Sequence, residues 1–400
     1  NPGQHPKYGM PILQKDNVGI EGLPTTAGAA VLMENYAPDA FITKQLEKNG
    51  AVILGKANLS EWAYYMCRGC PVGYSAVGGQ TFNPYGRKMF ESGGSSSGSG
   101  VAVAANFAVA AVGTETSGSI LSPSSQNSVV GLKPTIGLLS RTGIVPISST
   151  LDTPGPMTKN TLDNAILLDA MLGKDPTDAK SVDSSTFRFS LHETTPLKGK
   201  RFGVFENFYD SDTVYQQTVE KIQEAGAKII FLNPEPTQLA GFLTLLNIDM
   251  KNDLPNYFNQ QGSKNLSVKS VADVVQFNLS DTLTYVPYGM QLLQGIVADT
   301  TSAEAFEKIK NDLHETGVKY FSSFFDENQL DAVLSINNYN AGFAAVDQFP
   351  CLTVPMGYKT TGEPINLTFI GKPWQEQTLL GLGAGFEALT HARKTPTNYD

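Results

Sequence analysis

One stretch of this 400-residue chain, residues 93–134, constrains the possible folds more than any other. It reads GGSSSGSGVAVAANFAVAAVGTETSGSILSPSSQNSVVGLKP, so two loops rich in glycine and serine flank an apolar run at residues 101–112. Glycine adopts backbone angles that other residues avoid, and serine adds a hydroxyl with little bulk. A flexible linker would have no apolar insert to bury. The stretch therefore predicts a helix at 101–112 that brings two tight turns to one place.

The composition is typical of a globular protein. Hydrophobic residues make up 41% of the chain and charged residues 17%, which is enough for a substantial core. The formal net charge of −9 provides no basic footprint for nucleic acid. No apolar run approaches the roughly 18 residues that a membrane helix needs. We therefore expect no nucleic-acid partner and no membrane span.

Periodicity and turn residues divide the rest of the chain into strands and helices. Strands are expected at residues 10–14, 51–54, 136–140, 144–147, 201–206, 228–232, 331–336, 351–355 and 366–371. Helices are expected at residues 40–49, 161–172 and 377–390, and a mostly helical segment at 239–325. Two of the strands, 201–206 and 228–232, bracket a further helix and predict a β-α-β unit.

A serine nucleophile needs a base, and histidine, the usual base, offers no candidate here. The four histidines, which lie in no run resembling a catalytic motif, are His5, His192, His314 and His391. Residues 94–98 do fit G-x-S-x-G with Ser96 as the nucleophile, but the α/β-hydrolase elbow requires a strand directly before it. Residues 83–88, NPYGRK, are typical of a turn, so this interpretation is disfavoured.

Two of the three cysteines, Cys67 and Cys70, form a C-x-x-C pair. Such a pair could be half of a metal site or a redox motif. No second pair and no nearby histidine completes a zinc site. We therefore expect two ordinary thiols and no metal.

Several motifs, in order along the chain, resemble the signature of the amidase signature family. They are GMPILQKDN at 9–17, GAVILGKANLSE at 50–61, the GGSS loop at 93–96, GTETSGSI at 113–120, GLKPT at 131–135 and DTPGPM at 152–157. The run GGQTFNPY at 78–85 is similar to the peptide-amidase-like branch of that family. The resemblance covers about residues 9–173 and returns near 330–394.

The resemblance implies a single α/β domain over residues 1–400, with a large twisted mixed β-sheet surrounded by α-helices. The core would comprise about residues 9–205 and 330–394, and a helical elaboration at about 235–328 would lie over the active site. Family members usually carry a longer helical lead-in, so we expect this chain to be trimmed at its N-terminus. No signal peptide is visible. A cytoplasmic location is favoured, and export stays open.

The resemblance also implies a catalytic triad. Ser119 would be the nucleophile, Lys15 the general base, and Ser95 the serine that relays the proton between them. A lysine that ends an apolar strand suits this role, because burial lowers the pKa of an ammonium group and leaves a neutral amine. In the family, the peptide bond before the relay serine, here Gly94–Ser95, is cis.

The resemblance assigns further roles around these three residues. The predicted oxyanion hole consists of the backbone amides of Thr116, Ser117, Gly118 and Ser119. The candidate substrate-binding residues are Tyr64, Met66, Ser96 and Gly94. The residues interpreted as structural are Asp16, Lys56, Ser97, Lys133 and Asp152, and Ser96 is also expected to brace its loop.

Three positions depart from the usual family pattern. Most members have an aspartate followed later by an arginine, where this chain has Glu115 and Leu121. Leu121 lacks the positive charge, which disfavours a substrate with an acidic arm. Ser117 stands where most members have glycine, and we expect it at the edge of the substrate pocket.

The predicted function is hydrolysis of a carboxamide C–N bond through an acyl-Ser119 intermediate, with no metal and no cofactor. The partner would be a small-molecule or peptide amide substrate, and the protein a monomer or homodimer. Two alternatives stay open. One is the amidase subunit of a tRNA-dependent amidotransferase, against which Leu121 argues. The other is an ester or carbamate hydrolase that uses the same triad.

Overall fold

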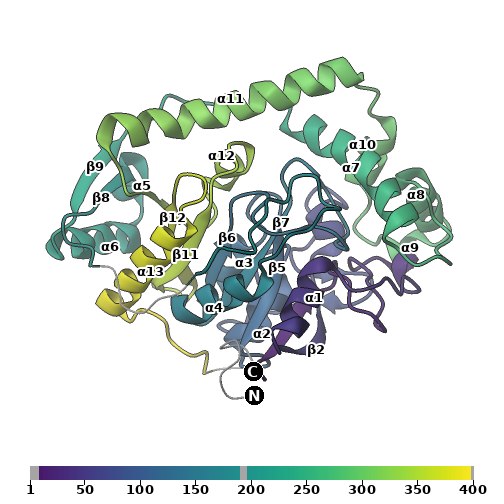
Figure 1. The fold of residues 1–400 in the computed structure, drawn as a ribbon, viewed down its shortest axis with the longest axis horizontal. Coiled ribbons are helices and arrows are strands. Elements are labelled where there is room, and N and C mark those ends of the chain that lie inside the picture. Colours follow the sequence, from purple (N-terminus) through teal and green to yellow (C-terminus); the bar gives the residue numbers. More distant parts are fainter. Residues whose placement is uncertain (1–8, 190–195, 398–400) are drawn as a thin grey trace.

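Ten strands form one continuous sheet at the centre of the protein, whose computed structural model describes residues 9–189 and 196–397 (Figure 1). The order across the sheet is β2-β1-β5-β7-β6-β11-β12-β10-β8-β9. The bounds are β1 Pro11–Lys15, β2 Val52–Ala57, β5 Ala110–Glu115, β6 Val130–Lys133, β7 Thr153–Thr158, β8 Arg201–Phe205, β9 Lys228–Leu232, β10 Ala332–Ile336, β11 Cys351–Tyr358 and β12 Pro364–Ile370. Two short strands pair apart from this sheet, β3 Tyr74–Ser75 and β4 Gly79–Gln80.

The sheet mixes parallel and antiparallel pairs. β1 runs parallel to β2 and β5, and β8 runs parallel to β9 and β10. The other neighbours, from β5 across to β10, are antiparallel. Because β10, β11 and β12 stand between β6 and β8, segments far apart in the sequence share one apolar core. This arrangement confirms the predicted α/β fold with one large mixed sheet, and also the β-α-β unit formed by β8 and β9.

Helices cover both faces of the sheet. Those outside the large helical segment are α1 Phe41–Lys48, α2 Ser97–Ala104, α3 Leu121–Gln126, α4 Thr161–Met171, α5 Glu206–Ser211, α6 Thr213–Glu224, α12 Ala341–Val346 and α13 Glu376–Thr390. Along β11, Leu352 belongs to the same apolar cluster as Leu379 of α13. The next residue, Thr353, lies with its hydroxyl 3.3 Å from that of Ser125 in α3. Alternate side chains of a strand point to opposite faces, so α13 and α3 lie on opposite sides of the sheet.

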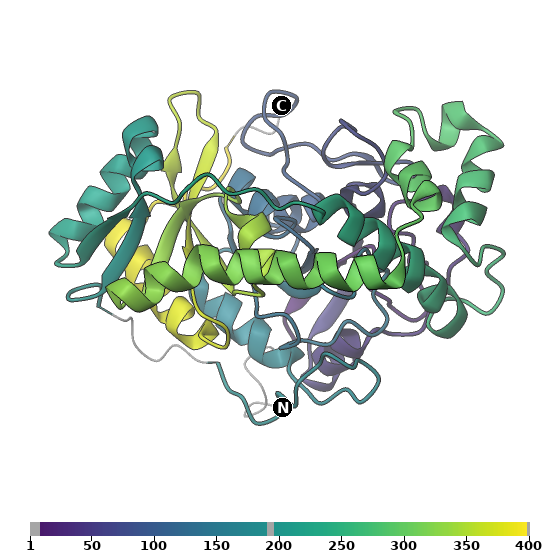
Figure 2. The ribbon, with the colours of Figure 1, turned by 90° about the horizontal axis from the view of Figure 1, so that it is seen from above.

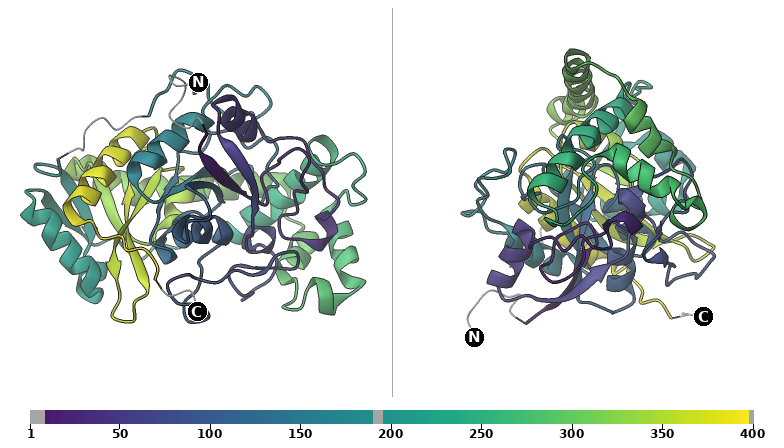
Figure 3. Two further views of the ribbon diagram at one scale, coloured as in Figure 1. Left: turned by 90° about the horizontal axis from the view of Figure 1, so that it is seen from below. Right: turned by 90° about the vertical axis from the view of Figure 1, so that its right-hand side faces the viewer.

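A helical segment lies over one side of the sheet. Its helices are α7 Phe242–Gln260, α8 Val271–Leu279, α9 Thr282–Tyr285, α10 Gln291–Ala298 and α11 Ala303–Asn328. Figures 1 and 2 show α11 running along the molecule from β8 and β9 to α7 and α10, and the right-hand view of Figure 3 shows these helices above the sheet. The apolar cluster beneath them includes Trp62, Met66 and Ile147, which ties the segment to loops of the core.

The sequence pattern predicted one helix at residues 101–112, and this prediction is wrong. Helix α2 begins at Ser97, inside the Gly/Ser loop, and residues 110–115 form β5. The small residues let α2 approach its neighbours closely. A Cβ atom at Gly98 would lie 2.5 Å from the Asn58 carbonyl oxygen, and one at Gly100 would lie 2.8 Å from that of Pro123. The loop glycines therefore serve helix packing as well as turns.

The strands predicted at 136–140 and 144–147 are also absent from the described structure. In these two stretches only Ile144 makes a β-bridge, an isolated one to Val18. The amide of Val145 donates to the Asn17 carbonyl at 2.8 Å, and carboxylates accept from other amides in and beside these stretches. Asp152 accepts from the amide of Ile147 at 2.8 Å, and Asp178 accepts from that of Arg141 at 2.9 Å. The other predicted strands and helices are present within three residues of their expected ends.

Across residues 9–189 and 196–397, no helix is both long and apolar enough to cross a membrane. His5 and His192 lie outside the described residues. His314 Nδ1 lies 2.9 Å from the carbonyl oxygen of Val346, and His391 is the C-terminal cap residue of α13. Neither of these two histidines hydrogen-bonds to a predicted site residue among those described.

Candidate functional site

The candidate site begins where two neighbouring parallel strands end. Lys15 is the last residue of β1, and Thr114 is the penultimate residue of β5, which pairs with β1. Lys15 Nζ lies 2.9 Å from Thr114 Oγ1 and 3.1 Å from the Thr114 carbonyl oxygen. It also lies 2.7 Å from Ser95 Oγ. The sheet thus brings together two of the predicted triad residues that are 80 positions apart.

Burial sets the protonation of Lys15. The side chain has no solvent-exposed surface, and the removal of water lowers its pKa from 10.5 to about 7. The carboxylates of Asp152 and Glu115 act in the opposite direction, because negative charge favours the ammonium form. A substantial fraction of Lys15 is therefore a neutral amine near neutral pH, which can accept a proton.

The serine loop before α2 surrounds this lysine. The peptide bond between Gly94 and Ser95 is cis, as the family resemblance implied. Ser96 is fully buried, and its hydroxyl donates to the Thr114 carbonyl at 3.0 Å and accepts from the Thr114 amide at 3.2 Å. Ser97 donates to the Gly93 carbonyl at 2.6 Å. These bonds are those expected of a serine that braces its loop, and they use its donor and one acceptor site within the protein. A contact of Ser96 with substrate stays a prediction.

The loop that carries Ser119 follows β5 and is held by the side chain of Glu115. Glu115 Oε1 accepts from the amide of Gly118 at 2.7 Å, and Oε2 accepts from those of Ile120 at 2.7 Å and Leu121 at 3.0 Å. The Ser119 carbonyl accepts from the Ser96 amide at 3.1 Å, which joins this loop to the serine loop. Ser119 is half-buried, and its hydroxyl makes no hydrogen bond within the described part of the chain.

Gly118 has a specific role in this loop. Its φ of +94° favours glycine, and a Cβ atom there would lie 2.9 Å from Nδ2 of Asn338. Its amide is already engaged by Glu115. Of the four amides predicted for the oxyanion hole, that of Gly118 is therefore occupied, and those of Thr116, Ser117 and Ser119 are the remaining candidates.

Tyr64 and Met66 lie in the wall of a small hollow of about 10 Å³. Its wall consists of Glu61, Tyr64, Met66, Cys70, Tyr74 and residues 285–289. The Tyr64 hydroxyl donates to the carbonyl of Cys70 at 2.9 Å. Gly94 is packed tightly, since a Cβ atom there would lie 2.6 Å from Ser60 Oγ.

Cys67 and Cys70 form a disulfide, which corrects the prediction of two ordinary thiols. Their Cα atoms are 5.6 Å apart, within the usual range for a bridged pair. The C-x-x-C spacing permitted this outcome, but spacing alone does not set the direction of the two side chains. Within residues 9–189 and 196–397, no three His, Cys, Asp or Glu side chains are grouped to hold a metal ion.

The residues interpreted as structural make structural contacts. Asp16 pairs with Lys56 at 3.3 Å and accepts from the Thr26 amide at 3.3 Å. Lys133 is fully buried and donates to the carbonyl of Ala344 at 3.2 Å. Asp152 accepts from Thr116 Oγ1 at 2.6 Å and so connects the Ser119 loop to the loop at 147–152.

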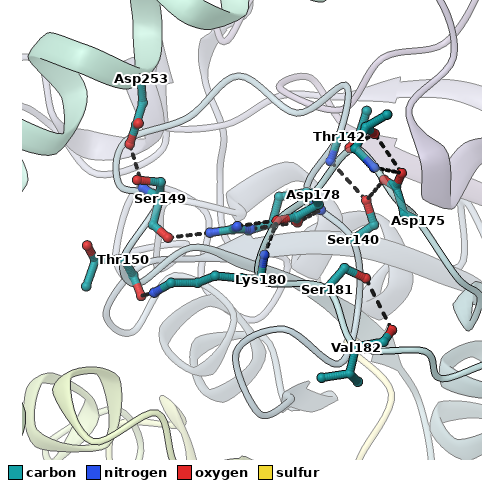
Figure 4. A network of polar contacts seen from close by, with 12 residues as sticks. Ser140, Thr142, Ser149, Thr150, Asp175, Asp178, Lys180, Ser181, Val182 and Asp253 are labelled. Atoms are coloured by element: carbon teal, nitrogen blue, oxygen red, sulfur yellow. Dashed lines mark hydrogen bonds and ion pairs between the residues drawn. The ribbon is translucent and has the colours of Figure 1, made fainter.

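A cavity of about 350 Å³ lies beside this site. Its wall includes Asn17, Thr114 and Thr116 on the side of the triad, and residues 141–149, 177–179 and several positions of α7 on the other sides. Figure 4 shows the polar network along this wall, where Asp253 from α7 reaches Ser149 and where Asp178 and Lys180 lie on the neighbouring loop. The cavity is large enough for a small organic molecule.

Several residues of the site could not be recognised from sequence. In the sequence, Glu115 differs from the family pattern, but nothing there indicates that it holds the Ser119 loop. Asn17, next to the Lys-Asp motif, donates to Thr114 Oγ1 at 3.0 Å. Asp253 and Asn338 come from segments more than 100 positions away and carry no local signal.

Comparison with known proteins relates nearly the whole chain to amidases. The family model described as Amidase matches residues 3–341. A protein of Arabidopsis thaliana described as a probable amidase is 35% identical, over 97% of this chain and 78% of that protein. The A subunit of a glutamyl-tRNA(Gln) amidotransferase from Pediococcus pentosaceus is 30% identical, over 96% of this chain and 83% of the subunit.

Solved structures are similar over nearly the whole chain. An amidase family protein of Bacillus anthracis superposes with a TM-score of 0.95 at 39% identity, covering 99% of this chain and 80% of that protein. A peptide amidase of Stenotrophomonas maltophilia superposes with a TM-score of 0.91 at 35% identity, covering 98% of this chain and 85% of that protein.

Proposed function

Because the chain belongs to the amidase family and is therefore an amide hydrolase, we propose that it cleaves a carboxamide C–N bond through an acyl-enzyme intermediate on Ser119. Lys15 is the general base in this proposal, and Ser95 relays the proton. One observation carries it: a fully buried lysine with a pKa lowered to about 7 lies 2.7 Å from Ser95 Oγ. A serine hydroxyl becomes nucleophilic only with such a base at hand.

The contacts of Lys15 suit both of its protonation states. As an ammonium, Lys15 Nζ donates to Ser95 Oγ and to both oxygens of Thr114, one acceptor for each N–H bond. As a neutral amine it has one lone pair, to which the Ser95 hydroxyl can donate once it has rotated. With its own proton given to Lys15, Ser95 Oγ can accept the proton of Ser119. The relay therefore needs no histidine.

The reaction proceeds in two balanced halves. Ser119 Oγ attacks the carbonyl carbon while its proton passes through Ser95 to Lys15. The tetrahedral intermediate then breaks its C–N bond, and the same relay returns the proton to the leaving amine. Water attacks the acyl ester by the reverse route and releases the carboxylic acid. The amides of Thr116, Ser117 and Ser119 are the candidates to stabilise the developing oxyanion.

Peptide amides are the proposed substrate class, since the peptide amidase of Stenotrophomonas maltophilia is 35% identical over almost the whole chain. The amidotransferase subunit is the second candidate, because one such subunit is 30% identical. A panel of glutamine, peptide amides, aryl amides, fatty amides and carbamates separates the candidates. We expect peptide amides to give the highest kcat/KM. A strong preference for glutamine, with co-purification of a partner subunit, would instead support the second candidate.

The first prediction tests the nucleophile. Ser119→Ala should abolish the acyl-enzyme and nearly all turnover, because no other hydroxyl replaces the attacking oxygen. Incubation with a fluorophosphonate, followed by peptide mass spectrometry, should locate the label on Ser119 in the wild type. Thermal unfolding should show that the variant is folded. Labelling of Ser96 in place of Ser119 would overturn the assignment.

A further inference from the structure

The cavity beside the triad has walls from distant parts of the chain. Thr114, a contact of Lys15, and Thr116, in the Ser119 loop, form the wall nearest the triad. Asp253 and Tyr257 of α7 form part of the opposite wall. At about 350 Å³, the cavity can hold the part of a substrate that extends beyond the scissile amide.

Negative charges outnumber positive charges in this wall. Its acidic and basic side chains, apart from the phenol of Tyr257, are one guanidinium, Arg141, and three carboxylates, Asp152, Asp178 and Asp253. Arg141 is already paired with Asp178, to which its Nε donates at 2.9 Å, and one of its terminal nitrogens donates to the Ser149 carbonyl. The guanidinium is therefore neutralised within the wall.

The two other carboxylates differ in their hydrogen bonding. Asp152 accepts from Thr116 Oγ1 and from the amides of Ile147 and Ser148, so both its oxygens are engaged. Asp253 Oδ2 accepts from the Ser149 amide at 2.6 Å, as Figure 4 shows. The Ser149 side chain also interacts with this carboxylate. Asp253 makes no ion pair with a described residue, so it supplies a negative charge that the wall itself does not neutralise.

Asn17 contributes polar backing to the same wall. It is 2% exposed, and its Nδ2 donates to Thr114 Oγ1 at 3.0 Å and to the Val145 carbonyl at 3.4 Å. Its Oδ1 is enclosed by protein and does not face the open cavity, so it offers no contact to a ligand there. Asp253 is therefore the side chain of this wall that can meet a charged ligand.

We propose that this cavity is a substrate subsite for a positively charged nitrogen, with Asp253 as its counter-ion. The proposal rests on the amide hydrolysis proposed above and names the chemistry of the preferred substrate. The ammonium group can belong to the acyl part, as in an amide of an amino acid, or to the amine that leaves, as in an N-acylated diamine.

Matched substrate pairs test the subsite and separate these two sources. The first pair is an ω-aminoacyl amide and the acyl amide with a methyl group in place of the ammonium. The second pair is an N-acyl diaminoalkane and the N-acyl alkylamine of equal length. Burial, together with the nearby charge of Asp249, raises the pKa of Asp253 to about 6, so assays at pH 8 keep the carboxylate ionised. We expect the wild type to favour the charged member of at least one pair by about tenfold or more in kcat/KM.

Variants at Asp253 identify the group responsible. Asp253→Asn can still accept from the Ser149 amide but carries no charge, so it should lose most of the preference and keep its activity on the neutral member. Asp253→Glu should retain the preference. The matched control is Asp249→Asn, one turn away on α7, which removes a carboxylate that bonds to Thr150 but does not line the cavity. This control should keep most of the preference.

Two outcomes would overturn the subsite. One is a wild type that treats both members of each pair alike, and the other is a preference that survives in Asp253→Asn. Either result leaves the acyl-enzyme proposal intact, because that proposal depends on loss of turnover for every substrate in Ser119→Ala. A third outcome would also count against the subsite. If a folded Asp253→Asn protein no longer hydrolyses the neutral substrates, Asp253 has a general role in activity and not one specific to charge.

Discussion

Glu115 controls the geometry of the loop that carries Ser119. Its two carboxylate oxygens accept three backbone N–H bonds from that loop, and the side chain is 1% exposed. A carboxylate is suited to this position because both its oxygens accept. From the end of β5, the glutamate side chain reaches the amides of Gly118, Ile120 and Leu121.

Replacement of Glu115 by glutamine should damage both stability and activity. The amide side chain has one accepting oxygen, and its NH₂ group would face a backbone donor. We expect Glu115→Gln to lower the free energy of unfolding by about 1–3 kcal/mol and also to lower kcat. Urea unfolding and steady-state kinetics measure the two effects.

A matched control separates loop geometry from general stability. Glu376 is equally buried and accepts from the Thr135 amide at 2.7 Å through Oε1. Glu376→Gln should cost stability and leave kcat close to that of the wild type. An unchanged kcat in Glu115→Gln would show that Glu115 has no influence on the nucleophile beyond folding.

The residue types of the site were predictable only where they lie in local motifs. Lys15, Ser95 and Ser119 each lie in a short run that resembles the family pattern, and the structure brings Lys15 and Ser95 together. Asn17 and Asp253 could not be predicted as a pair, because 236 positions separate them and no periodicity relates them. Their common cavity exists only after α7 has packed over the core.

At the level of elements, the prediction of secondary structure is wrong where one run of small residues contributes to both a helix and a strand. Residues 101–112 are small and apolar apart from Asn106 and Phe107, and such a run fits a buried helix and a buried strand equally well. The structure divides this run, because α2 starts earlier at Ser97 and β5 occupies the centre of the sheet between β1 and β7. A central strand with both faces covered shows no alternation from which a boundary could be read.

The prediction of strands between β6 and β7 is wrong for a different reason. Much of this segment is buried, but several of its backbone amides are bound by carboxylates and not by neighbouring strands. Asp152, Asp178 and Asp249 together accept from amides of Arg141, Ile147, Ser148 and Thr150. Sequence periodicity contains no information about such partners: Asp152 lies in the segment itself, Asp178 in a later loop and Asp249 in α7.

The disulfide between Cys67 and Cys70 should make a modest contribution to stability. It closes a very short loop, so the loss of chain entropy that it imposes on the unfolded state is worth about 2 kcal/mol. Cys67→Ser combined with Cys70→Ser should lower the free energy of unfolding by about that amount and change kcat by less than about threefold. Urea unfolding with and without reductant measures the effect.

The double variant also supplies its own control. Wild type should shift on addition of reductant, whereas Cys67→Ser with Cys70→Ser should not, because Cys351 is the one other cysteine and is free and buried. Equal stability of the two proteins under oxidising conditions would show that the bridge does not form in solution.

At the level of the whole molecule, the depressed pKa of Lys15 is a product of the complete fold. No neighbouring motif lowers it: the nearby charges of Asp152 and Glu115 raise it, and burial alone overcomes them. Burial of Lys15 requires β1 and β5 to pair and the serine loop to close against them. Lys15 could be proposed as the base from its motif, but its protonation state depends on packing that only the assembled sheet provides.

The central claim is that Lys15 acts as the base through Ser95, and the pH dependence of kcat/KM tests it. A lysine must lose its proton to act, so kcat/KM should rise with pH through the apparent pKa of the free enzyme's Lys-Ser-Ser unit, which the burial of Lys15 sets at about 7. Lys15→Ala should reduce kcat/KM by several orders of magnitude. It should also remove this acid limb from the profile.

Lys15→Arg provides the control for charge and size. A guanidinium remains protonated throughout the accessible pH range, so this variant should be as inactive as Lys15→Ala. Because the groups act as one relay, Lys15→Ala combined with Ser95→Ala should cost far less than the sum of the two single losses. The decisive measurement is the kcat/KM profile from pH 5 to 9 for wild type and Lys15→Ala. An acid limb near pH 7 that disappears with Lys15 is the predicted result, and a limb that survives the substitution unchanged would contradict the account.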